Sequence, residues 1–260
     1  MKTRSALPFI LPSLLALSPP SPAGETLVQI STIDALLQGI FDGNVTFDEL
    51  KQHGDFGIGT LDNLDGEMIA LDGKFHQIDS KGTVHEIPGN AETPFAAVTF
   101  FKSDKTLKLA AIGSLADLQA FLDRKILSGN LFHAVKITGS FTAMDLRSVP
   151  RQDAPFRTLT EVVKEQSVFR LSGVSGTLVG FRCPEYVKGI NVPGYHFHFI
   201  SRDGKQGGHV LDCSLEQADV EIDTLENFRM LLPRDGDFLK ADFAEHDEKA
   251  IEAVEKPSTD

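Results

Sequence analysis

The stretch PGYHFHFISRDGKQGGHVLDC, residues 193–213, contains three of the eight histidines in the chain. Two alternating runs flank an Asp203-Gly204 pair, which is a strong signal for a β-hairpin. A two-residue turn at this pair predicts that His198 lies directly opposite His209. Side chains paired in this way have Cβ atoms about 4.5–5.5 Å apart. The hairpin therefore predicts that the two imidazoles are neighbours.

The two faces of this hairpin follow from the alternation of side chains along a strand. His196 shares the face of the first paired histidine and is expected opposite Leu211, so all three imidazoles project from one face. Phe197 and Phe199 point the other way, into a core. The Gly207-Gly208 pair could insert a bulge and shift this register.

Three imidazoles on one face can reach a single metal ion, because zinc binds histidine nitrogens at about 2.0–2.1 Å. His196, His198 and His209 would leave at least one coordination position open, the pattern of a catalytic zinc rather than a structural one. The alternative is a hairpin whose histidines face solvent and serve packing or hydrogen bonding. The pattern favours the open metal site but names no reaction.

The rest of the sequence indicates a mixed α/β (α+β) chain. Residues 33–53 have helical spacing, and Thr46 followed by Glu49 predicts a capping box that opens a second short helix. Asp72-Gly73 predicts a hairpin, and Ser114 predicts the start of a further helix.

The second half of the chain is expected to be rich in β-structure. Residues 131–146 predict strand, turn and strand. Short strands over 176–183, 194–201, 208–215 and 218–225 predict an antiparallel sheet or a small barrel. The expected organisation follows in order along the chain: a signal peptide over 1–23, a mixed N-terminal domain over 24–172, a β-rich metal-binding domain over 173–236 and a C-terminal tail over 237–260.

Charge and composition exclude some classes of partner. The chain has 260 residues and a formal net charge of −12. Nucleic acids and anionic membrane surfaces both need clustered Lys and Arg, so neither is an expected partner. A small anionic substrate needs only a local cation and stays compatible. We also expect no membrane-spanning segment, because the apolar run 6–17 is too short.

The N-terminus is typical of a secretory signal peptide. Lys2 and Arg4 precede the apolar run, and Ser21-Pro22-Ala23 resembles a small-x-small cleavage site. A disordered apolar leader is the alternative. Export predicts a secreted or periplasmic protein, in which Cys183 and Cys213 could form a disulfide. Two free buried thiols fit the sequence equally well.

Two charged residues on predicted strands are further candidates for the site. Glu67 shares a face with Ile69 and Leu71, and a carboxylate on an apolar face must be paired, hydrated or functional. A strand-end carboxylate in water is the plain alternative. Arg147 could bind a substrate carboxylate bidentately, although the sequence alone favours an ion pair with Asp145 or a surface position.

Several stretches together resemble the α-acetolactate decarboxylases. The matching segments, in the family's order, are GDFGIGTLDNLDGEMIALDGKFHQ (54–77), TPFAAVTFF (93–101) and SGTLVGFRCPEYVKGINVPGYHFHFISRDGKQGGHVLDC (175–213). The combination of the glycine-aspartate run, the H-x-H and the spaced third histidine is more specific than any one motif.

The resemblance implies a two-domain α/β fold, an active site in the β-rich domain, and a homodimer. It also implies that a tail glutamate folds back over the site; Glu255 fits that role best, with Glu248 and Glu252 as competitors. The implied site consists of a zinc ion on three histidines and four pocket residues: His196, His198, His209, Glu67, Arg147, Thr60 and Glu255.

The implied reaction is the decarboxylation of 2-acetolactate, a 2-hydroxy-3-oxo acid, to acetoin. Zinc acts as a Lewis acid that stabilises the developing enediolate, and Arg147 orients the substrate carboxylate. A glutamic acid, Glu67 or Glu255, then protonates one face and yields one enantiomer. The family handles both substrate enantiomers, one of them after a carboxylate shift.

Two other classes of function remain open at this point. Cupin-like dioxygenases or isomerases also place H-x-H on a strand, but they expect a glutamate shortly after the second histidine. The corresponding stretch here, FISRDGK (199–205), contains none. A secreted, non-enzymatic metal-binding protein would explain the histidines but not Glu67 and Arg147.

Overall fold

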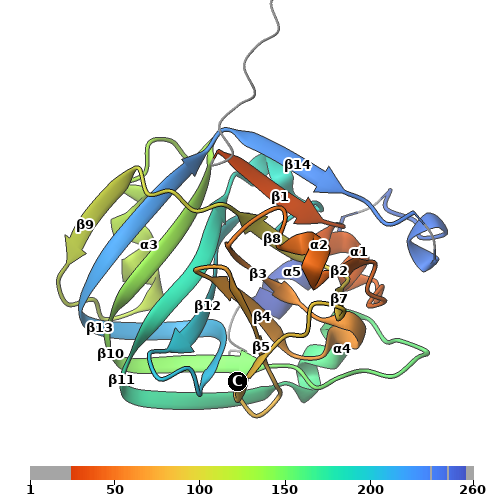
Figure 1. Ribbon diagram of the computed structural model, residues 1–260, viewed down its shortest axis with the longest axis horizontal. Helices are drawn as coiled ribbons and strands as arrows, with labels where there is room; N and C mark the ends of the chain where they lie inside the picture. Colours follow the sequence, from red (N-terminus) through yellow and green to blue (C-terminus); the bar gives the residue numbers. More distant parts are fainter. Residues whose placement is uncertain (1–24, 235, 245, 256–260) are drawn as a thin grey trace, which may run out of the picture.

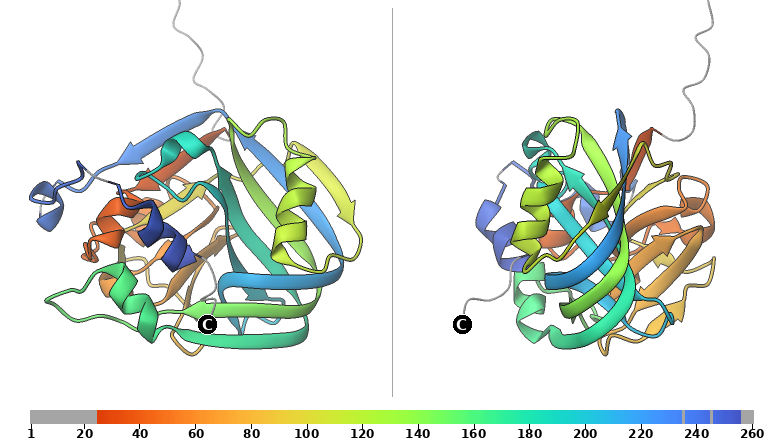
Figure 2. Two further views of the ribbon diagram at one scale, coloured as in Figure 1. Left: turned by 180° about the vertical axis from the view of Figure 1, so that it is seen from behind. Right: turned by 90° about the vertical axis from the view of Figure 1, so that its left-hand side faces the viewer.

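The computed structural model describes residues 25–234, 236–244 and 246–255. The expected signal peptide lies outside the described residues. Most of the described chain forms two β-layers that lie side by side (Figure 1), and β3 and β4 of one contact β11 and β12 of the other. The helices are short, and some of them lie against the faces of these layers (Figure 2). This mixed α+β architecture agrees with the expected fold class.

The first layer is a seven-stranded sheet. All its neighbouring strands pair antiparallel except β1 and β14, which are parallel. In spatial order its strands are β14 (Asn227–Leu231), β1 (Thr26–Ile30), β8 (Ala96–Thr99), β3 (Phe56–Thr60), β4 (Glu67–Leu71), β5 (Lys74–Ile78) and β6 (Val84–Glu86).

The second layer is a five-stranded antiparallel sheet that closes on itself. An additional pairing between β10 and β13 joins the two sides, so four strands form a small barrel and β9 adds to its edge. In spatial order the strands are β10 (Phe132–Ser148), β11 (Ser167–Cys183), β12 (Gly194–Ser201), β13 (Gly207–Leu225) and β9 (Lys105–Leu109).

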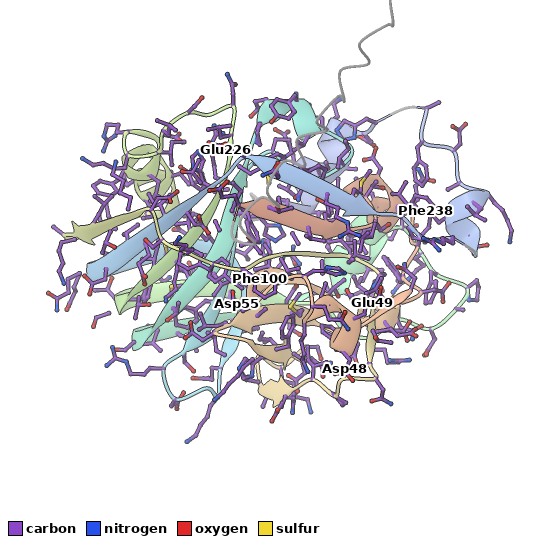
Figure 3. The ribbon with its side chains drawn as sticks, turned by 45° about the horizontal axis from the view of Figure 1, so that its top comes forward. Asp48, Glu49, Asp55, Phe100, Glu226 and Phe238 are labelled. Atoms are coloured by element: carbon purple, nitrogen blue, oxygen red, sulfur yellow. The ribbon has the colours of Figure 1, made fainter. Side chains whose placement is uncertain are left out.

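The barrel strands form one continuous run along the chain, β9 to β13, and the seven-stranded sheet takes strands from before and after that run. β9 and β10 precede residue 172 and yet belong to the barrel, whereas β14 follows the barrel strands and returns to the seven-stranded sheet. Glu226 is the one residue between β13 and β14 and marks this crossing (Figure 3). The expected boundary at residue 172 therefore does not coincide with the division of strands between the layers.

The barrel strands are longer than the sequence pattern predicts. Residues 131–146 were expected to turn, but β10 runs unbroken for 17 residues, and β13 for 19 residues spans both of the short strands expected there. A Cβ at Gly139 would collide with the Gln217 carbonyl, so this glycine allows close strand packing rather than a turn. Bulges between β10 and β13 bend the strands instead.

Five α-helices are present among the described residues. The helical stretch expected over 33–53 contains two helices, of which the second opens at Thr46 as predicted, and Gly39 with φ +84° follows the end of the first. Thr46 and Ser114 cap α2 and α3 as predicted, each accepting a backbone N–H three residues on. The helices are α1 (Ile33–Leu37), α2 (Phe47–Leu50), α3 (Leu115–Asp123), α4 (Leu159–Val162) and α5 (Glu248–Glu255).

The remaining elements are short. They are the strand pair β2 (Val45–Thr46) and β7 (Glu92–Thr93), and the 3₁₀ turns η1 (Asp62–Leu64), η2 (Val163–Glu165), η3 (Glu185–Val187) and η4 (Asp237–Leu239). In the described parts of the chain, no helix is both long and apolar enough to cross a membrane.

The histidine hairpin has the predicted register. His198 pairs with His209, and the two residues that follow His198 pair with Gly208 and Gly207. The prediction of a two-residue turn at Asp203-Gly204 is wrong. Of these two residues only Gly204 has positive φ, and a longer loop over 202–205 closes the hairpin. The glycine pair does not bulge; a Cβ on Gly208 would lie 2.8 Å from the Arg147 carbonyl oxygen, so glycine lets β10 approach. The bulge falls at Leu211 instead.

Two apolar cores lie on opposite faces of this hairpin. Phe197 and Phe199 are buried in a core, as predicted, and this core also contains side chains of α3. The histidine face continues through Ile200 into the core between the two layers, where it meets Phe56 and Ile69 of the seven-stranded sheet. The hairpin therefore presents its histidines to the neighbouring sheet and not to solvent.

The two cysteines lie in different cores and form no disulfide. Cys213 packs with the α3 side of the barrel and Cys183 with the core between the layers. Burial raises the pKa of each thiol to about 12, so both are protonated at neutral pH.

Truncation of Phe199 tests the importance of the core behind the histidines. Phe199 is fully buried, so Phe199→Ala should lower the free energy of unfolding by about 3–5 kcal/mol. Val168 is 60% exposed, and Val168→Ala should change it by less than about 0.5 kcal/mol. Urea denaturation of both variants measures the difference; equal losses would contradict this account of the core.

Candidate active site and metal centre

The candidate residues from the sequence meet at the seam between the two layers. The seven-stranded sheet contributes through β3 and β4, the barrel through β10, β12 and β13, and the tail through α5. They line a cavity of about 40 Å³. The candidates brought together there are Thr60, Glu67, Arg147, His196, His198, His209 and Glu255.

The three imidazoles form one compact cluster. Their ring centroids are 4.8–5.4 Å apart, and one nitrogen from each lies within 4.8 Å of the others. Nε2 of His196 is 3.0 Å from Nδ1 of His209. The alternative of solvent-facing histidines is wrong, because His198 and His209 are only 1% and 2% exposed.

His198 is oriented by the neighbouring sheet. Its Nδ1–H donates to the carbonyl oxygen of Met68 at 2.9 Å. In the neutral imidazole the proton on Nδ1 leaves a lone pair on Nε2. That Nε2 is buried and has no hydrogen-bond partner among the described residues. A buried acceptor without a partner is costly unless something binds it, and a histidine held through its other nitrogen is how proteins present metal ligands.

Burial keeps all three histidines neutral. Removal from water lowers the pKa of His196 to about 3 and holds the pKa values of His198 and His209 well below their usual range, and the nearby Arg147 charge adds to the effect. Metal ions bind the unprotonated imidazole. The donor set and the unpaired Nε2 of His198 therefore fit a bound metal ion.

Glu67 and Arg147 form a buried ion pair. Nη1 of Arg147 is 3.2 Å from Oε1 of Glu67, and Oε2 of Glu67 is 3.5 Å from Nε2 of His198. Burial raises the pKa of Glu67 to about 7, although Arg147 opposes the shift. The ion pair of Arg147 with Asp145 that the sequence favoured is not found, because Asp145 lies 3.3 Å from Arg170 instead. The alternative of a Glu67 carboxylate in water is not found either.

Thr60 supports Glu67 from the adjacent strand. The two residues are paired across β3 and β4. The Thr60 hydroxyl donates to the carbonyl oxygen of Gly66 at 2.7 Å, which fixes the residue before Glu67. Gly66 has φ +81°, and a Cβ there would collide with the Ile78 carbonyl. The sequence GE at 66–67 thus turns the chain and places the carboxyl at the seam.

Among the tail glutamates, Glu255 enters the site. Its Oε2 lies 3.8 Å from Nε2 of His196 and 3.7 Å from Nε2 of His209. Burial raises its pKa to about 7, against the effect of Arg147. Glu252 is exposed and does not line the small cavity, and the Glu248 side chain lies outside the described part of the structure.

The apolar wall of the cavity was not found from the sequence. Its side chains come from α1, α4, α5 and intervening loops, and no local pattern links segments so far apart. The Met68 carbonyl could not be predicted for a different reason. Every residue has a backbone carbonyl, so the residue type does not show which one accepts a hydrogen bond. The wall consists of Ile33, Leu36, Leu64, Phe95, Val149, Leu159 and Val254.

Comparisons with known proteins agree with this site. The family model described as alpha-acetolactate decarboxylase matches residues 27–245. The chain is 50% identical over 234 residues to the alpha-acetolactate decarboxylase of Methanosarcina mazei, covering 90% of this chain and 81% of that protein. It is 45% identical over 229 residues to that of Methylococcus capsulatus, covering 87% of each.

Solved structures show the same fold. The crystal structure of alpha-acetolactate decarboxylase from Bacillus subtilis strain 168 superimposes with a TM-score of 0.87 at 39% identity, covering 89% of this chain and all of that one. Fold, site and relatives together define a carboxy-lyase. The chain belongs to the α-acetolactate decarboxylase family. A cupin-like enzyme and a non-enzymatic binding protein are therefore not supported.

The raised pKa of Glu67 has a consequence for stability. Between its ordinary value of 4.5 and about 7 the Glu67 carboxyl holds a proton in the folded metal-free protein that the unfolded chain releases, so its own contribution to stability is lost as the pH rises through this window. The three histidines act in the opposite direction, because their pKa values are lowered. Relative to wild type, Glu67→Gln should therefore gain on the order of 3 kcal/mol of stability as the pH rises from 5 to 7.5.

Urea denaturation of metal-free protein at pH 5 and pH 7.5 measures this difference. The exposed Glu216 offers a control, and Glu216→Gln should keep the wild-type pH dependence. An unchanged pH dependence in Glu67→Gln would show that Glu67 is not held protonated by burial.

Proposed function

We propose that this chain decarboxylates 2-acetolactate to acetoin and carbon dioxide with a zinc ion held by His196, His198 and His209. The observation that carries the proposal is the convergence of three neutral imidazoles shielded from water, in which Nε2 of His198 has no hydrogen-bond partner among the described residues. Zinc, when bound, would supply a Lewis acid that stabilises negative charge on the substrate oxygens as carbon dioxide leaves.

Arg147 would hold the substrate carboxylate. Only its Nη1 is bonded to Glu67, and its Nε–H is buried without a partner among the described residues. A guanidinium can bind a carboxylate with two parallel hydrogen bonds. Held in this way, the carboxylate can be aligned so that the breaking bond overlaps the neighbouring carbonyl π system.

A glutamic acid would protonate the enediolate that remains. A general acid is most effective when its pKa lies near the working pH, and the pKa values of Glu67 and Glu255 are both raised to about 7 by burial. The two side chains come from β4 and α5, so each would reach the enediolate from its own direction. Delivery from one side yields one enantiomer of acetoin.

The cavity excludes a large substrate. Its volume of about 40 Å³ is far below the ~300–1,000 Å³ of ligand pockets in general. Apolar side chains of α1, α4 and α5 surround the polar cluster and would face the methyl groups of 2-acetolactate. The same wall excludes water, which strengthens each electrostatic interaction inside.

Two further expectations stay predictions. Export follows from the N-terminal 23 residues, whose structure lies outside the described chain. A homodimer follows from the family resemblance alone.

Chelation should abolish acetoin formation, and added zinc should restore it, because the histidines have no other means of stabilising charge on the substrate. Carbon dioxide release from racemic 2-acetolactate is the measurement, with zinc-saturated chelator as the control. Full activity of metal-free protein would refute the proposal. A zinc-loaded protein that acts on no 2-hydroxy-3-oxo acid would favour a binding protein instead.

Two substitutions separate ligand loss from proton-transfer loss. Glu67→Gln should keep its zinc and lose about 10²–10⁴-fold in kcat, as expected for a general acid. Glu255→Gln should also lose zinc affinity, because its Oε2 lies within 3.8 Å of two ring nitrogens of the cluster.

Zinc content and carbon dioxide release are measured for both variants. Glu252→Gln changes an exposed glutamate on the same helix and should leave both quantities unchanged. Wild-type kcat in Glu67→Gln would remove Glu67 from the proton-transfer role.

A further inference from the structure

The C-terminal tail reaches the active site through α5. After β14 the tail runs outward through the 3₁₀ turn Asp237–Leu239, where Phe238 lies at the outer edge of the molecule (Figure 3). It then returns, and α5 lies beside α1 (Figure 2). Glu255 is the last residue of that helix, so its position depends on how the tail is held.

Two kinds of contact hold α5. On its inner face Ile251 and Val254 are buried against side chains of α1 and α4. Before the helix, the contacts are polar: Gln38 donates to the carbonyl oxygen of Asp242 in an exposed position, and Nδ1 of His246 lies 2.8 Å from Oδ1 of Asp34. The second of these is the better shielded, since the Asp34 and His246 side chains are 11% and 22% exposed.

The His246–Asp34 pair sits where three segments of the chain meet. Asp34 belongs to α1, and its backbone N–H donates to the carbonyl oxygen of Gly189, in the loop before the histidine strand β12. Gly189 has φ +79°, and a Cβ there would lie 2.7 Å from Oδ2 of Asp34 and 3.4 Å from Nδ1 of His246. The loop thus leaves room for the imidazole to reach the carboxylate.

The same tail segment borders a second, larger hollow. This hollow of about 690 Å³ is lined by both His246 and Glu255, and it shares His209 and Glu255 with the small cavity. The tail between His246 and Glu255 therefore forms part of the wall between the hollow and the metal centre. Displacement of that segment would open the centre to water.

We propose that the His246–Asp34 pair is a positioning device that fixes the tail and thereby places the Glu255 carboxyl beside His196 and His209. Neither residue touches the reacting atoms, so neither is catalytic. The inference rests on the role given to Glu255 in the proposed function. The inference adds that the role of Glu255 depends on the contact made by His246, nine residues earlier in the chain.

The pair should stabilise the docked tail measurably. A hydrogen bond to a charged group that is partly shielded from water shifts an equilibrium by about tenfold or more. Without it, the tail would lose its best shielded polar contact before α5 and would keep the apolar contacts of Ile251 and Val254. The docked state would still dominate, but it would open more often.

Hydrogen exchange on the zinc-loaded protein measures this opening directly. His246→Ala should lower the protection of the α5 amides about tenfold and leave the β10 amides unchanged. His246→Gln keeps an N–H donor and should recover most of the protection. The matched control is His85→Ala, which removes another His–Asp pair, 2.9 Å long, from β6.

Two results of this experiment would overturn the proposal. One is unchanged protection of α5 in His246→Ala. The other is an equal loss of protection across the barrel, which would show a general effect on folding.

The rate of zinc release to a chelator tests the link to Glu255. His246→Ala should raise that rate about tenfold in an otherwise wild-type chain and leave it unchanged in a Glu255→Gln background. Equal effects in both backgrounds would refute positioning through Glu255.

These measurements distinguish failure of the role proposed for Glu255 from failure of the positioning role of the His246–Asp34 pair. If α5 loses protection while Glu255→Gln retains wild-type kcat and zinc affinity, the role proposed for Glu255 fails, and the positioning proposal fails with it. If Glu255→Gln is impaired while His246→Ala leaves α5 protected, the proposed function stands and only the positioning role is refuted.

Discussion

The hydrogen bond from Nδ1 of His198 to the Met68 carbonyl is the contact on which the site depends. It joins the barrel to the seven-stranded sheet at a fully buried position. It also fixes the tautomer, so that Nε2 carries the lone pair and faces the cavity. Because Met68 follows Glu67 on β4, the same contact brings the Glu67 carboxyl within 3.5 Å of that Nε2. The two layers, the His198 imidazole and the Glu67 carboxyl are thus positioned together.

Burial determines the chemistry of the groups that meet there. Loss of water is the largest cause of every resolved pKa shift in the cluster: it lowers the pKa values of three histidines and raises those of two glutamates. Each shift favours the uncharged form. Below about pH 7 the metal-free site is therefore nearly neutral apart from Arg147. A cation that enters finds ready imidazole donors, and an anionic substrate finds a guanidinium whose charge water does not screen.

Local patterns predicted some elements well because short-range physics decides them. The His198–His209 register follows from chain length and alternation, and the caps at Thr46 and Ser114 follow from the hydrogen-bonding capacity of their hydroxyls. The turn expected in 131–146 was wrong for a non-local reason. Gly139 packs against the Gln217 carbonyl of β13, and nothing near residue 139 reveals a strand almost eighty residues further on.

The sequence by itself determined the donor set: three histidines on one hairpin face, and a resemblance that named Glu67, Arg147, Thr60 and Glu255 beside them. Only the tertiary structure decided how these groups act. It paired Arg147 with Glu67 rather than Asp145, removed the cluster from water, and brought α5 across the chain so that Glu255 rather than Glu252 faces the histidines. The physical reason is that pKa values and ion pairs depend on distance and solvent access. Both are set by contacts between segments far apart in the chain.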